Sequence, residues 1–154
     1  GKAIVIYLSR GEKSVGSDYP QHMKKKPLYL HHTAAGKCIL AHLPEKRVRK
    51  IADEHSLFER TENTITTVDD LLEELEGVRD RGYATNQEEE VRGLNAIGAP
   101  IFDPNGDILG AISLSGPKSR MRGERFEETL PELVQNAADV IEVNINMNSK
   151  VDEF

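Results

Sequence analysis

The stretch that decides the fold is LNAIGAPIFDPNGDILGAISLSGP, residues 94–117. Two apolar runs flank Asp-Pro-Asn-Gly, a composition typical of a tight turn, so they predict an antiparallel β-hairpin. Successive side chains of a strand point to opposite faces. In each strand one face is mainly bulky and aliphatic, with Ile97 and Ile101 in the first run and Ile108, Ile112 and Leu114 in the second. The other face of each strand mixes in small residues. If these two faces coincide in the hairpin, a shallow depression is lined by Ala96, Gly98, Ala111, Ser113 and Ser115.

The face of small residues raises the question of what lies on it. A solvated strand face usually carries Lys, Glu, Thr or Arg, whereas this one carries Ala, Gly and Ser, so we expect something to cover it closely. Covered hydroxyls need hydrogen-bond partners, because an unpaired buried polar group costs roughly 1–3 kcal/mol. A polar ligand, ordered water or a helix terminus could each supply them. The alternative is that the serines face solvent on the wet side of the sheet.

A candidate cover is the helix predicted over TAAGKCILAHL, residues 33–43, with Thr33 as its N-cap. Its first turn contains Ala34, Ala35 and Gly36. Small residues there allow either tight packing on the sheet or the approach of a ligand to free backbone N–H groups, where the helix dipole favours anions. Together, the small strand face and this helix terminus predict a pocket for a small carboxylate.

The other predicted elements surround this hairpin. Residues 2–9 read as a strand, and a second helix runs from Pro44 to about Glu54. A third helix begins after Thr67 and ends at Gly82 in a left-handed conformation. The last helix carries one apolar stripe, and Pro131 predicts a start near Leu130 or a kink. The stripe comprises Phe126, Leu130, Leu133, Val134, Ala137, Ile141 and Ile145. This order predicts a single α+β domain.

Composition narrows the function. The chain has 154 residues and a formal net charge of −6, which argues against this chain gripping DNA through its phosphates. No apolar run approaches the ~20 residues of a membrane helix. The single cysteine, Cys38, excludes an internal disulfide, and no secretory signal pattern opens the chain, so we expect a cytoplasmic protein.

Catalytic and metal motifs are weak. The sequence has no nucleophile elbow around the serines and no phosphate-binding glycine loop, so we predict no enzymatic activity. The Glu88–Glu90 run is interpreted as a solvated loop or as backbone-capping groups. Cys38 and His42 lie four residues apart on one helical face, with His31 and His32 nearby, and this leaves a zinc site as an alternative. We expect no cofactor.

Three stretches together resemble the C-terminal effector-binding domain of IclR-family transcriptional regulators. They are LHHTAAGKCILAHL (30–43), TITTVDDLLEELEGVRDRGYATNQEEEVRGLNAIGAPIFD (64–103) and GAISLSGPKSR (110–120). The resemblance implies a GAF-like curved antiparallel sheet flanked by helices, which binds a small metabolite and relays its occupancy to a DNA-binding domain. It also implies homodimers or tetramers. The family's winged helix-turn-helix would precede residue 1, so residues 1–154 are expected to be the effector-binding domain alone, without binding an operator.

The resemblance also implies a set of effector-binding residues. They are Leu30, Ala34, Ala35, Gly36, Asn86, Ala96, Ser113 and Ser115, which overlap the set that strand alternation selects. Family members that take small oxo-acids can carry Asp where Asn86 stands and Cys where Ala96 stands. Both differ here, which argues against glyoxylate or pyruvate and favours a larger ligand. The alternative function is an oligomerisation module without a small-molecule effector.

Overall fold

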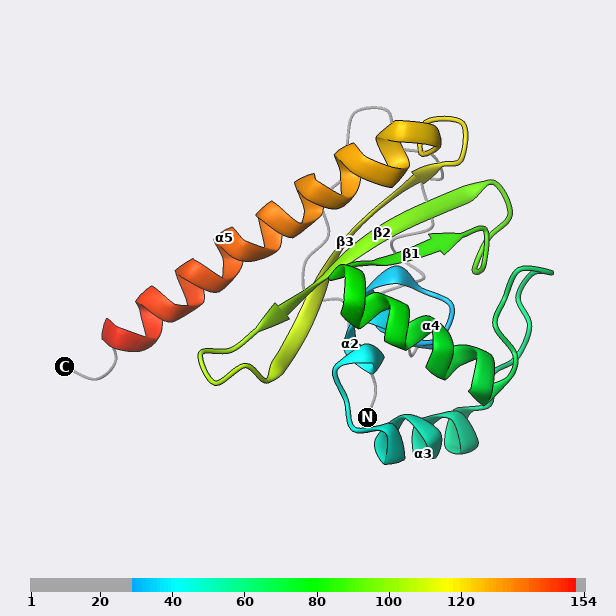
Figure 1. Cartoon of the computed structure of the whole chain (residues 1–154), viewed down its shortest axis with the longest axis horizontal. Coiled ribbons are helices and arrows are strands. Elements are labelled where there is room, and N and C mark those ends of the chain that lie inside the picture. Colours follow the sequence, from blue (N-terminus) through cyan, green and yellow to red (C-terminus); the bar gives the residue numbers. More distant parts are fainter. Residues whose placement is uncertain (1–28, 152–154) are drawn as a thin grey trace.

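The computed structural model describes residues 29–151. The strand predicted at residues 2–9 lies outside them. The described elements form an antiparallel sheet with helices on both sides (Figure 1).

The sheet has three described strands in the order β1 (Ala84–Gln87), β2 (Leu94–Phe102) and β3 (Ile108–Pro117), and both pairings are antiparallel. The predicted hairpin is confirmed as β2 and β3. The carboxylate of Asp103 closes its turn by accepting from the backbone N–H groups of Asn105 and Asp107, at 2.8 and 2.9 Å. The short strand β1 was not predicted.

One detail of the hairpin differs from simple alternation. Ile101 pairs with Gly110, but the next pair is Phe102 with Ile108, so Leu109 is an extra residue with no partner in β2. Such a β-bulge shifts the residues beyond it to the other face. The placement of Ile108 with Ile112 on the bulky face was therefore wrong, and Ile108 lies opposite Phe102 instead.

The first three described helices follow the predicted pattern. They are α2 (Ala34–Ala41), α3 (Glu45–His55) and α4 (Val68–Arg81). The hydroxyl oxygen of Thr33 accepts from the Gly36 N–H and that of Thr67 from the Asp70 N–H, so both predicted N-caps are confirmed. Gly82 ends α4 with φ of 82°, the left-handed conformation that glycine adopts without steric cost.

The last helix starts as predicted but with an irregular first turn. A π-helical turn at Arg125–Thr129 leads into α5 (Leu130–Val151). Pro131 has no N–H to donate, which explains why a regular ladder does not run through this turn. The predicted stripe was wrong at one position, because Leu133 is 57% exposed; the buried face instead includes Ala138. Val140, Val143 and Met147 are exposed on the same helix.

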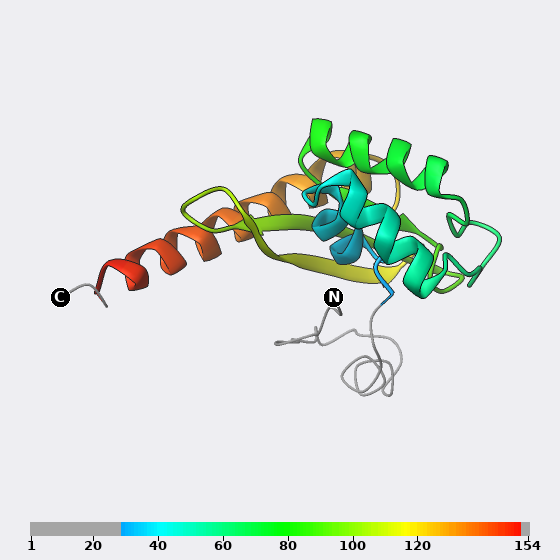
Figure 2. The same cartoon turned by 90° about the horizontal axis from the view of Figure 1, so that it is seen from below.

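The two faces of the sheet carry separate cores, and Figures 1 and 2 show the helices that cover them. Ile97 and Ala99 of β2 pack with Leu130 and Val134 of α5 and with Phe126 of the π-helical turn before it. On the opposite face α2 packs against the strands, α4 packs against α2, and α3 packs against α4. This core includes Leu40, Val48, Leu71, Leu75 and Val78. The predicted α+β class is confirmed. In the described part of the chain, no helix is both long and apolar enough to span a bilayer.

Candidate functional site

Strand register brings the predicted sheet residues of the site onto one face. Asn86 lies opposite Ala96, which lies opposite Ser115, and this makes one row across all three strands. Gly98 and Ser113 form the neighbouring row. Directly opposed residues of antiparallel strands share a face, so these five residues form the floor of the candidate site. We call this the small-residue face.

The N-terminus of α2 lies directly on the small-residue face. A Cβ atom on Gly98 would lie 2.9 Å from the carbonyl carbon of Ala34 and 3.1 Å from the backbone nitrogen of Ala35. Such distances are too short for a side chain, so glycine is required for this approach. The N–H of Gly36 is satisfied by Thr33, at 3.0 Å. The helix predicted to cover the face therefore does so at Gly98.

The cover does not extend over the serines. Ser113 and Ser115 are exposed, whereas Ala34, Ala96 and Asn86 are buried. The expectation that both hydroxyls lie beneath a close cover was wrong: α2 contacts β3 as well as β2, yet both serines on β3 remain exposed at the edge of the described sheet. The face is thus closed at Gly98 and open at the serines.

Leu30, Ala35 and Gly36 are the remaining members of the predicted set. Leu30 is buried, and a Cβ on Gly36 would lie 2.2 Å from its carbonyl oxygen. Ala35 is half-buried. The segment at Leu30, before α2, is therefore packed tightly against the first turn of that helix.

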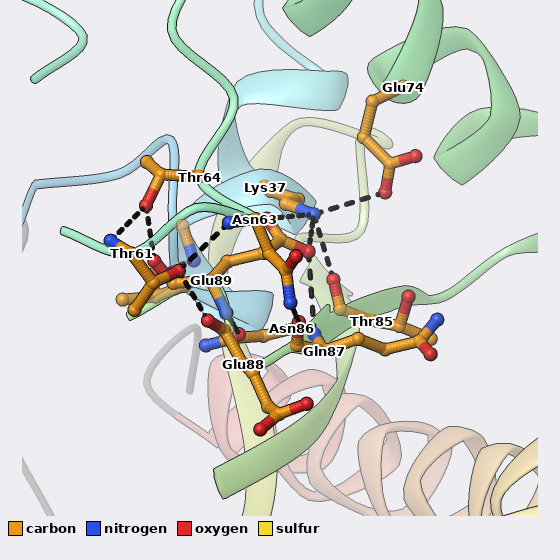
Figure 3. Close-up of polar contacts among 12 residues, drawn as sticks. Lys37, Thr61, Asn63, Thr64, Glu74, Thr85, Asn86, Gln87, Glu88 and Glu89 are labelled. Atoms are coloured by element: carbon orange, nitrogen blue, oxygen red, sulfur yellow. Dashed lines mark hydrogen bonds and ion pairs between the residues drawn. The ribbon is translucent and has the colours of Figure 1, made fainter. Parts of the chain in front are cut away.

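A buried ion-pair network lies beside this site and was not predicted (Figure 3). The ammonium of Lys37, on α2, donates to the carboxylate of Glu89 at 2.8 Å, to the carbonyl of Thr85 at 2.9 Å and to the carboxylate of Glu74 at 3.2 Å. Its side chain is 1% exposed. Arg81 also donates to Glu74, at 3.0 Å, so the network balances two cations with two carboxylates.

The three glutamates at 88–90 do not behave alike. Glu88 accepts from the backbone N–H of Gly93 and pairs with Lys118, so the backbone-capping interpretation holds for it. Glu89 is buried, and burial raises the pKa of its carboxyl although Lys37 opposes that effect. The interpretation as a solvated loop was therefore wrong for Glu89. The sequence did indicate that Lys37, the partner of Glu89, could be buried. Lys37 shares a helical stripe with Ala34, Cys38 and Ala41, which are all buried.

The residues considered for zinc lie in different surroundings. Cys38 is fully buried, and burial raises the pKa of its thiol to about 12. His42 donates from Nδ1 to the carbonyl of Cys38 at 2.8 Å and packs edge-on against Phe102. His31 and His32 pack with Tyr29 and Phe58. Among residues 29–151, no group of three or more His, Cys, Asp or Glu side chains is placed to hold a metal ion.

Burial of His32 makes stability depend on pH. Burial, followed by the charges of His31 and Arg60, lowers the pKa of His32 to about 4, and neither ring nitrogen has a hydrogen-bond partner among residues 29–151. The unfolded chain takes up this proton near pH 6.5, so stability is present above that pH and is lost as the pH falls toward 4. We expect a loss of about 2 kcal/mol between pH 7 and pH 5.

The control for this expectation is His32→Phe, measured by urea denaturation across the same pH range. Burial also lowers the pKa of His31, which adds to the loss, and the raised pKa of Glu89 acts in the opposite direction. Subtracting the variant's pH dependence from that of the parent chain isolates His32. Identical slopes for the two proteins would contradict the expectation.

A shallow hollow of about 440 Å³ has a different lining from the predicted site. It is lined by residues 58–61 and 90–92, including Phe58, Arg60 and Arg92. None of the eight predicted effector-binding residues lines it. Ligand binding in this hollow can therefore be distinguished from ligand binding at the candidate site.

Comparisons with family models, curated proteins and solved structures agree on one family. The family described as "Bacterial transcriptional regulator IclR C-terminal" matches residues 15–143. A probable HTH-type transcriptional regulator, ArcR of Halobacterium salinarum, is 43% identical over 145 residues, which are 94% of this chain and 55% of that protein. The chain thus spans about half the length of the curated relatives it matches. The relatives are transcriptional regulators, in agreement with the prediction of a regulator rather than an enzyme.

Solved structures share the fold. The C-terminal domain of the E. coli transcriptional regulator KdgR is 33% identical, with a TM-score of 0.72 over 80% of this chain and 74% of that one. The inducer-binding domain of PobR from Acinetobacter, a double mutant in complex with 3-hydroxybenzoic acid, is 28% identical. Its TM-score is 0.68, over 75% of this chain and 66% of that one.

Proposed function

The chain belongs to the IclR family of bacterial transcriptional regulators, and on that basis we propose that residues 1–154 are its effector-binding domain. The effector is a small organic acid. In the whole protein, binding of this acid controls the affinity of an N-terminal winged helix-turn-helix domain for DNA. The regulator acts as a homo-oligomer, and the exposed apolar residues of α5 are the surface we assign to self-association.

One observation carries this proposal: the N-terminus of α2 lies on the small-residue face, beside two exposed serine hydroxyls. The helix terminus supplies backbone N–H groups and the positive end of the helix dipole. The hydroxyls of Ser113 and Ser115 and the amide of Asn86 supply further polar groups on the same face. Groups of this kind, converging on small side chains, suit a carboxylate. The aromatic acid bound to PobR is a precedent in a related fold.

The effector acts by favouring one conformation of the domain. A ligand shifts a conformational equilibrium only through different affinities for the two states. Because α2 and the sheet approach within van der Waals distance at Gly98, a ligand held between the serines and the α2 terminus would fix their separation. We infer that a change in the separation between α2 and the sheet transmits effector binding to the DNA-binding domain.

Thermal stability with candidate acids tests the proposal. The panel contains pyruvate, glyoxylate, lactate and 3-hydroxybenzoate. An acid present at 100 times its dissociation constant adds about 2.7 kcal/mol, which we expect to raise the melting temperature by roughly 5 °C or more. The shift should disappear in the double variant Ser113→Ala, Ser115→Ala and persist in Ser119→Ala, which changes another exposed serine. Stabilisation that survives the double variant would place the acid elsewhere. No shift with any acid would favour self-association alone.

A further inference from the structure

Phe102 contacts helices on both sides of the sheet. Ile97 of β2 packs in the core beneath α5, whereas its neighbour Gly98 faces the N-terminus of α2, so the two helices lie on opposite faces. Phe102 ends the same strand. Its ring packs against the ring of His42, the C-cap of α2, and its backbone N–H donates to the carboxylate of Glu142 on α5. One residue therefore joins the two helices.

The ring of His42 is held by α2 itself. A carbonyl oxygen can only accept, so Nδ1 of His42 carries the proton that it donates to the carbonyl of Cys38, at 2.8 Å. The backbone N–H of His42 bonds to the carbonyl of Ile39 in the same turn, at 3.2 Å. The ring centroids of His42 and Phe102 lie 4.8 Å apart at an interplanar angle of 82°, an edge-to-face geometry that attracts two aromatic rings. Displacing α2 therefore displaces the surface on which the Phe102 ring rests.

The backbone contact of Phe102 lies at the β-bulge. Phe102 pairs with Ile108 where the register shifts, so its N–H lies at an irregular point of the ladder. This N–H donates to Oε1 of Glu142 at 2.9 Å, and an ionised acceptor makes such a bond stronger than one between neutral groups. Along α5, Glu142 stands between Val140 and Val143, two of the exposed apolar residues of this helix. The contact thus reaches the surface that we assign to self-association.

We propose that Phe102 links α2 to α5, so that effector binding at the α2 N-terminus changes the self-association of the protein. This inference rests on the proposed function and adds the route by which the site is regulated. Coupling between distant sites is carried by packed side chains and hydrogen bonds that join rigid elements. His42, Phe102 and Glu142 form such a chain across the end of the sheet, with Phe102 as the positioning residue. Because linkage is reciprocal, self-association alters the affinity for the effector by the same factor.

A cycle of variants without ligand tests the link. His42→Ala removes the ring that Phe102 packs against, whereas Phe102→Leu removes the Phe102 ring but keeps its backbone N–H. In the ¹⁵N-labelled chain we expect His42→Ala to shift the amide resonances of residues 140–144 and to raise hydrogen exchange at the Phe102 N–H about tenfold. In the Phe102→Leu background, His42→Ala should leave residues 140–144 unchanged. Equal shifts in both backgrounds would overturn the link.

Matched controls separate the link from the loss of a histidine or a carboxylate as such. His55→Ala removes a half-buried histidine at the end of α3 and should leave residues 140–144 unchanged. Glu142→Gln keeps an acceptor oxygen for the Phe102 N–H, whereas Glu142→Met removes it. Hydrogen exchange at this N–H should rise in Glu142→Met alone, and not in Glu132→Met, an exposed position in the first turn of α5. The same rise in Glu132→Met would contradict a specific contact.

Sedimentation velocity with pyruvate, glyoxylate, lactate and 3-hydroxybenzoate tests the consequence for regulation. We expect a bound acid to change the self-association constant of the parent chain at least about fivefold and that of Phe102→Leu less than about twofold, while both bind the acid. No effect on the parent, or the same effect on both proteins, would overturn the inference. If no acid binds while the ligand-free cycle holds, the proposed function is overturned and the link between the helices stands.

Discussion

Lys37→Met is expected to destabilise the protein by about 3–5 kcal/mol, because it leaves the carboxylate of Glu89 buried without its cation. Lys37 is 1% exposed, and Glu89 is buried beside it. Glu74 loses one partner but keeps Arg81 and is partly exposed, so Glu89 accounts for most of the loss. Denaturation in urea, followed by circular dichroism, measures the difference in unfolding free energy.

The matched control is Arg49→Met in the pair of Arg49 with Glu45, which has a similar distance of 2.8 Å but is largely exposed. Exposed pairs typically contribute below about 1 kcal/mol, so this variant should be close to the parent chain. Adding Glu89→Met to Lys37→Met should restore most of the lost stability. A loss below about 1 kcal/mol for Lys37→Met alone would show that the network is not coupled to folding.

Gly36→Ala is the second change with a large expected effect, a loss of about 3 kcal/mol or more. Its Cβ would lie 2.2 Å from the carbonyl oxygen of Leu30 and 2.6 Å from the Leu30 Cα, and backbone atoms cannot rotate aside as a side chain would. The first turn of α2 would have to move, which should also weaken any ligand bound at its terminus. Thermal and urea unfolding measure the loss of stability.

Gly110→Ala serves as the control for this substitution. Gly110 lies in β3, and within residues 29–151 no atom beyond its two chain neighbours lies within 4 Å of the position that its Cβ would take. The same chemical change should therefore alter stability by less than about 1 kcal/mol. Equal effects at the two glycines would mean that the close approach of Leu30 to α2 does not constrain the fold.

Local patterns were enough to predict the hairpin and, except at Ile108, the alternation of faces within each strand. The Asp-Pro-Asn-Gly turn predicts the hairpin, but the pairing of Gly98 with Ser113 and of Ala96 with Ser115 depends on the bulge at Leu109, which shifts the register by one residue. The caps at Thr33 and Thr67 are equally local, since each requires only a hydroxyl before a helical apolar stripe. These elements determine most of the small-residue face.

Features that depend on distant partners were not predicted. The strand β1 contains Thr85, Asn86 and Gln87, which have little strand propensity as a group, and it forms because β2 pairs with it. Lys37 and Glu89 are separated by 52 positions, so a buried lysine could be suspected from the stripe of α2, but its partner could not be named. Alternation likewise assigned the serines to a face but could not show that they are exposed there.

The central claim is that an organic acid binds between the α2 N-terminus and the small-residue face. The most direct measurement is a titration of the ¹⁵N-labelled protein, followed by NMR, with whichever panel acid gives the largest thermal shift. The account predicts saturable shifts of the Ala35 backbone, the Asn86 side-chain amide and the backbone of Ser113 and Ser115, all with one dissociation constant. Shifts confined to the hollow around Phe58 and Arg92, with the small-residue face unchanged, would contradict it.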